Sequence, residues 1–305
     1  MVSQTEVTLV EVGPRDGLQY ERGFFPTPRK IELVDTLSGS GLKRIEVTSF
    51  VHPKAVPQLA DAAQVMNGIS KKPGIVYSAL VPNMTGCRAA LETPVDQLAM
   101  FVSASQAHNQ KNLNQSVEES LEGLSQVAAA VKEAGRGLRG YIVTAFGCPY
   151  EGRISQDQLK RILEAYAGMG VDEVAMGDTT GMANPRQVEE LAAWLLEGGW
   201  PMDLAFHFHD SRGLGLANVL AAYQAGIRIF DCSVGGVGGC PTAIGASGNV
   251  DTLDMVNLFE EMGVDTGLHF AVLHQAAALI TEELQAQLPS RTFGQGRPKW
   301  SGLGD

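Results

Sequence analysis

The chain has 305 residues, of which 44% are hydrophobic and 19% are charged, a composition typical of a globular protein. Its 34 acidic residues against 23 basic residues give a formal net charge of −11, which repels a phosphate backbone and argues against nucleic acid as a partner. This charge still allows a phosphorylated small molecule to bind where a few basic residues gather at one pocket.

Short apolar runs rich in β-branched residues alternate with longer segments of helical period along the whole chain. The predicted strands are 6–12, 43–49, 74–80, 97–103, 140–146, 172–178, 203–209 and 228–234. A helical segment follows each of them. The clearest start signal is Ser116, which precedes Glu118 and Glu119 and then apolar residues at helical spacing over 121–131. Other helical segments begin near Pro28, Pro57, Ser155, Pro185, Gly213 and Asn249.

Repeated strand–helix units without a Pro/Ser/Gly-rich linker predict one α/β domain, a (β/α)8 TIM barrel over 1–285, because parallel strands need crossover helices and a closed sheet has no exposed edge. A doubly wound open sheet is the structural alternative, but no predicted strand is followed by the GxGxxG sequence of dinucleotide-binding versions. From about Glu260 the chain is predicted to form a helix and then a short C-terminal tail, 286–305, which we expect to be mobile.

The four cysteines form no CxxC pair and predict neither a disulfide scaffold nor a zinc knuckle, so a reducing compartment fits best. We expect Cys232 in the core and Cys87 on a helix surface, whereas Cys148 is ambiguous. The first twelve residues have no signal-peptide or transit-peptide pattern, and no apolar run reaches about 18 residues. The sequence therefore predicts a cytoplasmic protein without a membrane partner.

Unusual polar residues recur where the predicted strands end. They are Arg15 and Asp16 after the first strand, Glu46 within the second, Asp178 at the end of the sixth, His207 and His209 at the end of the seventh, and Cys240 and Asn249 after the eighth. In a barrel the C-terminal ends of all strands meet at one face, so these side chains are expected to converge on one pocket.

His207 and His209 are two positions apart on a strand, so their side chains point to the same face, with backbones about 7 Å apart. Two imidazoles placed in this way can chelate one ion. With Asp16 and the carbonyl of Asn249 they make two nitrogen and two oxygen donors, which suit octahedral Mg²⁺ or Mn²⁺ better than tetrahedral zinc. The alternative is a hydrogen-bonded histidine pair without metal; the adjoining Asp210 and the strand-end location favour a metal site.

Glu46 lies in an apolar strand, where an unpaired carboxylate is costly, so it needs a cation nearby. Arg15 is the expected partner, and its guanidinium can also face a developing oxyanion. A purely structural salt bridge is the alternative, and the two interpretations are compatible. The segment 233–249 contains six glycines around Cys240; such loops can cradle phosphates, but a thiol on a closing loop can also transfer a proton.

Six motifs together resemble 3-hydroxy-3-methylglutaryl-CoA lyases, members of a wider barrel family of metal-dependent lyases and Claisen-condensing enzymes that includes isopropylmalate synthases. The motifs are VEVGPRDGLQ (10–19), IEVTSFVHPK (45–54), GCPYEG (147–152), MGDTTG (176–181), HFHDSRGLGLAN (207–218) and GGCPTAIGASGN (238–249). The resemblance spans nearly the whole chain. The glycine-rich cysteine loop separates the lyases from the synthases.

The resemblance implies that Asp16, His207, His209 and Asn249 bind Mg²⁺ or Mn²⁺, with Asp178 close by. It implies catalytic roles for Arg15, Glu46, Cys240 and Asp178. The reaction that it implies is retro-Claisen cleavage of a 3-hydroxy-3-methylglutaryl thioester to acetyl-CoA and acetoacetate, as in leucine degradation and ketone-body formation. The implied partners are an acyl-CoA substrate and a second copy of the chain in a homodimer.

Three positions depart from the typical lyase pattern, namely Tyr20, Arg212 and Thr242, and a related 3-hydroxyacyl-CoA substrate stays open for that reason. Lys54, Lys111 and Arg153 are candidates for binding the coenzyme A phosphates. A condensing synthase usually carries a C-terminal regulatory region, for which this chain leaves no room. A pyruvate carboxyltransferase needs a modified lysine at a strand end, and units five to seven offer none. A non-catalytic scaffold would have lost the ligands, and all of them are present.

Overall fold

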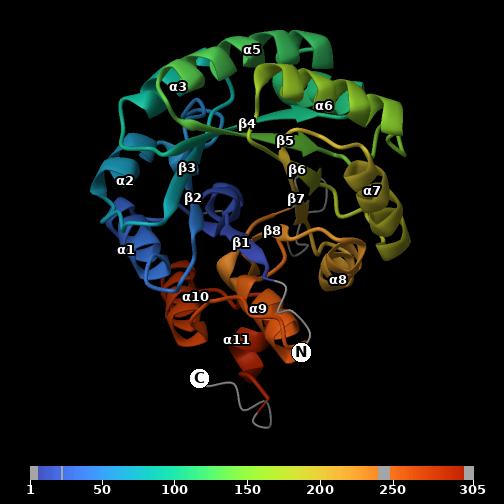
Figure 1. Cartoon of the computed structure of the whole chain (residues 1–305). Coiled ribbons are helices and arrows are strands. Elements are labelled where there is room, and N and C mark those ends of the chain that lie inside the picture. The colour runs from blue at the N-terminus through green and yellow to red at the C-terminus, as the bar shows by residue number, and fades with distance from the viewer. Residues whose placement is uncertain (1–5, 22, 240–247, 299–305) are drawn as a thin grey trace.

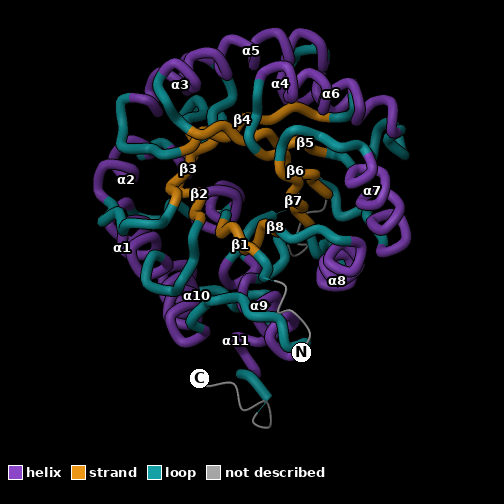
Figure 2. Tube along the Cα trace, in the orientation of Figure 1, coloured by secondary structure: helices purple, strands orange, loops and turns teal. Residues whose placement is uncertain are grey.

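A computed structural model describes residues 6–21, 23–239 and 248–298. Within them, eight parallel strands pair in chain order, and β1 pairs with β8 to close the barrel. Figure 2 shows the strands as an inner ring with the long helices outside it. The strands are β1 (Thr8–Glu11), β2 (Arg44–Ser49), β3 (Val76–Leu80), β4 (Gln97–Ser103), β5 (Gly137–Val143), β6 (Glu173–Asp178), β7 (Asp203–Phe208) and β8 (Ile229–Cys232). The predicted (β/α)8 barrel is confirmed.

The helices cover the outside of this ring (Figure 1). They are α1 (Thr27–Leu37), α2 (Ala62–Gly68), α3 (Met84–Leu91), α4 (Gln106–Leu113), α5 (Val117–Glu133), α6 (Gln156–Met169), α7 (Pro185–Glu197), α8 (Gly215–Ala225), α9 (Thr252–Glu261), α10 (Phe270–Leu284) and α11 (Arg291–Gln295). Helix α10 packs against both α1 and α9, so it joins the last unit of the outer ring to the first. Helix α4 is an insertion between β4 and α5 that was not predicted from the sequence.

Helix starts follow the predicted chemistry. The Ser116 hydroxyl accepts a hydrogen bond from the Glu119 N–H, and the Glu119 carboxylate accepts one from the Ser116 N–H, so a complete capping box opens α5. Ser155 and Gln158 form a second capping box at the start of α6. None of the described helices is long and apolar enough to cross a membrane.

Strand β5 lies three residues earlier than predicted. The prediction began at Gly140, whereas the observed strand also includes Arg139, which is only 1% exposed and is neutralised inside the barrel by Glu173 and Asp231. The strand ends at Val143 because the next residue, Thr144, has a φ of +58°, which leaves extended geometry.

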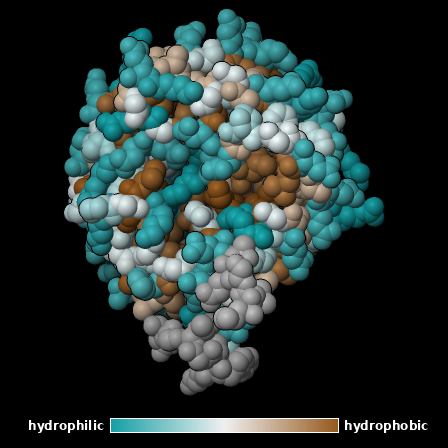
Figure 3. Space-filling view, in the orientation of Figure 1, coloured by the Kyte–Doolittle hydropathy of each residue, from teal (hydrophilic) through white to brown (hydrophobic). Residues whose placement is uncertain are grey.

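Two apolar layers hold the barrel together. The larger one lies between the strands and the helices, and it includes Cys87, which is fully buried. The expectation that Cys87 lies on a helix surface was wrong, because α3 turns this side chain toward the strands. The smaller layer lies inside the ring and centres on Leu80, Ala99, Tyr141, Ala175 and Ala205. In the face seen in Figure 3, apolar side chains show mainly inside a hydrophilic rim.

Charged residues fill much of the remaining barrel interior. Arg44 of β2 donates a hydrogen bond of 2.8 Å to Glu173 of β6. These two strands lie on opposite sides of the ring. Barrel interiors are usually filled by branched apolar side chains. The alanines of the inner layer leave the space in which this polar network lies.

The described part of the C-terminal tail packs on the barrel. Helix α11 contacts α9 and lies outside it in Figure 1. The Ser290 hydroxyl donates to Asp251 at 2.6 Å, and the Thr292 N–H donates to Asp254 at 2.7 Å. The start of α9 therefore fixes the tail through two buried carboxylates.

Candidate metal and active site

A short helical turn, Gly13–Gly17, places Arg15 and Asp16 at the barrel mouth directly after β1. The backbone N–H groups of Arg15 and Asp16 both donate to the Val12 carbonyl, at 3.1 and 2.7 Å. The turn packs closely on the loop after β8, because a Cβ atom on Gly17 would lie 2.6 Å from Val237. Both side chains are consequently buried and fixed.

Asp16, His207 and His209 form a cluster whose ligand atoms all lie within 4.8 Å of one another. The two histidine Nε2 atoms are 3.1 Å apart, and Asp16 Oδ2 is 3.8 Å from Nε2 of His207. All three residues are less than 10% exposed. The predicted convergence of the ends of β1 and β7 is what the structure shows.

Asn249 completes this arrangement. Its backbone bridges to that of His209, and its side-chain amide donates to Asp16 Oδ2 at 2.9 Å. Its Oδ1 atom is buried and has no hydrogen-bond partner among the described residues. A buried carbonyl oxygen without a partner, beside two imidazoles and a carboxylate, fits a divalent cation. Asp210 instead accepts a hydrogen bond of 2.7 Å from the Gly215 N–H at the start of α8.

The protonation states suit cation binding. Burial lowers the pKa of His209 to about 3, so at neutral pH the ring is uncharged and keeps a lone pair for a ligand bond. Burial would raise the pKa of Asp16, but the positive charge of Arg15 outweighs it and holds that pKa below the usual range. The cluster therefore offers an anionic oxygen donor from Asp16 and a neutral imidazole donor from His209.

Arg15 pairs with Glu46 as expected from the sequence. Its Nη2 and Nε atoms donate to the same oxygen of Glu46, at 2.7 and 3.0 Å, and Nη1 contacts Asp16. Burial would lower the pKa of Arg15, but the carboxylates of Glu46 and Asp16 raise it, so the guanidinium stays charged. The Tyr141 hydroxyl donates to Glu46 at 3.0 Å from the opposite side. These contacts fix the Arg15 guanidinium beside Asp16 of the ligand cluster.

Asp178, at the end of β6, lies outside the cluster of three ligands. Its Oδ1 atom accepts the N–H groups of Met182 and Ala183, at 2.8 and 3.1 Å, and so closes the loop after the strand. Its Oδ2 atom is buried without a partner among the described residues. Burial raises the pKa of Asp178 to about 7, which makes it a group that can change protonation near neutral pH.

A pocket of about 520 Å³ extends from the metal cluster toward α4. Its outer part is lined by His108, Lys111 and Tyr150, with the Lys111 ammonium 4.0 Å from the centre of the Tyr150 ring. Among the three predicted basic residues, only Lys111 belongs to this lining, whereas Lys54 and Arg153 do not. Cys240 lies outside the described residues.

Four further buried polar residues of the site region were not predicted from the sequence, namely Glu11, Arg139, Tyr141 and Asp231. Like Glu46, Arg139 and Asp231 are charged residues within apolar strands, and such residues need partners. Nothing in the sequence pattern shows which partner each has, because Arg139 on β5 pairs both with Glu173 on the next strand and with Asp231 on β8.

Glu11 ties three segments together at the base of the site. Its Oε1 atom accepts the N–H groups of Gly13 and Val234, and its Oε2 atom accepts the Thr252 hydroxyl, all within 2.9 Å. Burial raises its pKa to about 7 despite these bonds. Between about pH 4.5 and pH 7, the folded state therefore holds a proton on Glu11 that the unfolded chain has lost.

We expect this proton to make the metal-free protein less stable as the pH rises. With a folded-state pKa above the unfolded value, the stabilisation is complete below about pH 4.5 and is lost as the pH passes 7, up to about 3 kcal/mol. Glu11→Gln should reduce the loss of unfolding free energy between pH 5.5 and 8, measured by urea unfolding in chelator. Glu197→Gln, at the exposed end of α7, is the control; an unchanged slope in Glu11→Gln would contradict the prediction.

The fold and the site define a class, a (β/α)8-barrel protein with a buried two-histidine, one-carboxylate cation site beside an arginine. The chain belongs to the HMGL-like family, whose model matches residues 6–280. It is 46% identical to a hydroxymethylglutaryl-CoA lyase of Bacillus subtilis over 94% of this chain and 96% of that protein. A solved HMG-CoA lyase of Acinetobacter baumannii, in complex with coenzyme A and 3-methylmalate, has a TM-score of 0.93 at 40% identity, covering 100% and 99% of the two chains.

A more distant likeness concerns the fold alone. The carboxyl transferase domain of Rhizobium etli pyruvate carboxylase has a TM-score of 0.69 at 18% identity, over 92% of this chain and 47% of that one. It shares the barrel with this protein. The alternative of a pyruvate carboxyltransferase receives no support beyond this common architecture.

Proposed function

We propose that the protein is a divalent-metal-dependent carbon–carbon lyase that cleaves 3-hydroxy-3-methylglutaryl-CoA to acetyl-CoA and acetoacetate. The observation that carries the proposal is the buried cluster of Asp16, His207 and His209 next to the fixed guanidinium of Arg15, in a chain of this family. Mg²⁺ or Mn²⁺ suits the mixed oxygen and nitrogen donors.

Asp16, His207, His209 and Asn249 would hold the ion. When bound, a divalent ion supplies Lewis acidity and a fixed point that orients substrate oxygens. Arg15 faces the negative charge that develops on the thioester enolate when the carbon–carbon bond breaks, and Glu46 holds Arg15 in place. Cys240 donates the proton that the new carbanion takes up. The hydroxyl proton leaves to Asp16, His207 or a water molecule.

Asp178 is the proposed group that holds or releases a proton near neutral pH. It acts close to the cluster, where burial has raised its pKa to about 7. The Oδ1 atom of Asp178 accepts the N–H groups of Met182 and Ala183 and so holds the loop after β6. The same carboxyl group thus carries the titrating proton and holds the backbone of the loop after β6.

The outer part of the pocket supports an acyl-CoA substrate. Lys111 offers a positive charge there, and the Acinetobacter relative binds coenzyme A. Of the three departures from the lyase pattern, Tyr20 lines the pocket, whereas Arg212 donates to the carbonyls of Thr180 and Gly181 and fastens two loops. Thr242 lies outside the described residues. Of the two departures that the structure describes, Tyr20 is the one placed to alter acyl selectivity toward a related 3-hydroxyacyl-CoA.

The first test is incubation of the purified protein with 3-hydroxy-3-methylglutaryl-CoA and Mg²⁺ or Mn²⁺, with and without excess chelator. We expect acetyl-CoA and acetoacetate in equal amounts, at a kcat near or above about 1 s⁻¹, and none after chelation. An inert substrate together with tight Mn²⁺ binding would overturn the substrate but keep the site. Light scattering in the same buffer tests the proposed homodimer.

Cys240→Ser should lower kcat by about 100- to 10,000-fold, the usual contribution of a positioned general acid. The serine hydroxyl has nearly the size of the thiol, but its much higher pKa makes it a poor proton donor. Mn²⁺ affinity should stay unchanged, because Cys240 is not a proposed ligand. Cys232→Ser, in the core, is the comparison variant. A fully active Cys240→Ser enzyme would remove this residue from the mechanism.

A further inference from the structure

Arg139 lies at the centre of the polar network inside the barrel. Its Nε atom donates to Glu173 at 2.6 Å, and its Nη2 atom donates to Asp231 at 2.6 Å. Its Nη1 atom donates to the Tyr141 hydroxyl and, at 3.2 Å, to the second oxygen of Asp231. This arginine therefore holds Asp231 by both oxygens, a geometry that fixes the carboxylate plane.

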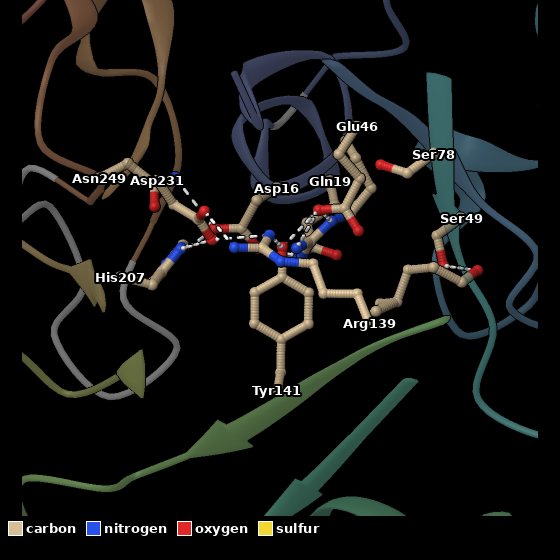
Figure 4. A network of polar contacts seen from close by, with 12 residues as sticks. Asp16, Gln19, Glu46, Ser49, Ser78, Arg139, Tyr141, His207, Asp231 and Asn249 are labelled. Carbon is tan, nitrogen blue, oxygen red and sulfur yellow. Dashed lines mark hydrogen bonds and ion pairs between the residues drawn. The ribbon is translucent and has the colours of Figure 1, made fainter. Parts of the chain in front are cut away.

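Asp231 also contacts a proposed metal ligand. Its Oδ2 atom lies 3.1 Å from Nδ1 of His207, and its side chain is fully buried (Figure 4). A carboxylate held by an arginine carries no proton, so it can only accept a hydrogen bond. The hydrogen of a neutral His207 ring must then lie on Nδ1, which leaves the lone pair on Nε2.

That lone pair points into the cation site. Nε2 of His207 faces Nε2 of His209 at 3.1 Å and Asp16 Oδ2 at 3.8 Å. Without the contact to Asp231, both tautomers and both ring orientations of His207 would be accessible. One of the two tautomers would place a hydrogen where the ion has to bind.

We propose that Asp231, held by Arg139, is a positioning residue for the metal site, because it fixes the ring orientation and the tautomer of His207. The inference rests on the proposed function, since it concerns the same site. Partners of this kind raise metal affinity, and their loss typically costs 10- to 100-fold in affinity.

A purely structural role for Asp231 would be to neutralise Arg139. Glu173 offers a matched comparison, because it is also a buried carboxylate that pairs with Arg139. Its other partner is Arg44, at the start of β2, and none of its hydrogen bonds in the described structure goes to His207. The two carboxylates thus share the structural role, and Asp231 alone contacts the histidine.

The test compares Asp231→Asn with Glu173→Gln by titration with Mn²⁺, followed by electron paramagnetic resonance, and by the visible absorption spectrum of bound Co²⁺. We expect the Mn²⁺ dissociation constant to rise about 10- to 100-fold in Asp231→Asn, with an altered Co²⁺ spectrum. Glu173→Gln should lose thermal stability but bind Mn²⁺ as the wild type does. Equal losses in the two variants, or unchanged affinity in Asp231→Asn, would overturn the proposal.

A second measurement needs no folded Asp231 variant. Nitrogen-15 spectra of the histidine rings in the metal-free wild-type protein, with His207→Gln used only to assign the signal, should show the hydrogen of His207 on Nδ1. A hydrogen on Nε2 would overturn the proposal. The proposed function fails separately: wild-type protein that binds Mn²⁺ but cleaves no 3-hydroxy-3-methylglutaryl-CoA leaves the role of Asp231 intact, whereas absence of Mn²⁺ binding removes both.

Discussion

Arg15→Met is expected to lower kcat by about 100- to 1,000-fold, the usual effect of removing one group that stabilises a developing oxyanion. The guanidinium is fixed by Glu46 and Asp16 and needs no rearrangement when charge develops. Mn²⁺ affinity should not weaken, because the variant removes a positive charge next to Asp16. Steady-state kinetics with saturating metal and Mn²⁺ titration measure the two effects.

Arg44→Met is the control for the structural interpretation of the Arg15–Glu46 pair. Arg44 also pairs with a buried glutamate, Glu173, but lies at the start of β2, away from the pocket lining. Breaking the buried Arg15–Glu46 pair costs about 3–5 kcal/mol of stability. Breaking the part-buried Arg44–Glu173 pair costs less, because Glu173 keeps its pairing with Arg139. If Arg15→Met lost stability as Arg44→Met does but kept its kcat, Arg15 would have a structural role only.

His209→Ala should weaken Mn²⁺ binding by more than about 100-fold, because loss of a ligand exceeds the effect of losing a partner of a ligand. The ring is neutral and fully buried, so its replacement leaves no uncompensated charge. Activity at limiting metal should fall in parallel and recover in part at high Mn²⁺. Isothermal titration and metal-dependent kinetics provide the two readouts.

His108→Ala provides the comparison within the same pocket. His108 is a buried histidine whose pKa is lowered by burial, and its Nδ1 atom has no partner among the described residues. It lines the outer pocket but is not part of the ligand cluster. We expect unchanged Mn²⁺ affinity for this variant. Equal affinity of His209→Ala and His108→Ala would contradict the assigned metal site.

The barrel could be predicted because it depends on local periodicity that recurs along the chain. Every predicted strand overlaps an observed one, and the capping box at Ser116 is present as expected. Three of the proposed ligands could be brought together from sequence alone, since strand ends in a barrel must meet at one face. The predicted family and reaction class are confirmed by the comparisons.

The interior network could not be predicted, because much of it joins strands that are not adjacent. Arg139 of β5 pairs with Asp231 of β8, and Arg44 of β2 pairs with Glu173 of β6. The predicted strand at Gly140 left out Arg139, which lies inside β5 and is buried with its partners. Those partners, Glu173 and Asp231, lie on two other strands. Cys87 was misplaced for a related reason, because the orientation of α3 on the sheet is not encoded in its own short pattern.

The closure of the barrel has a consequence for how the protein matures in the cell. Asp16 and Asn249 are hydrogen-bonded across 233 positions of sequence, at the seam where β1 pairs with β8. During translation the segment that carries Asp16 emerges first and has to wait for nearly the whole chain before its partners exist. A nascent or truncated chain therefore has no complete cation site, and metal uptake would mark those molecules in which synthesis and ring closure are finished.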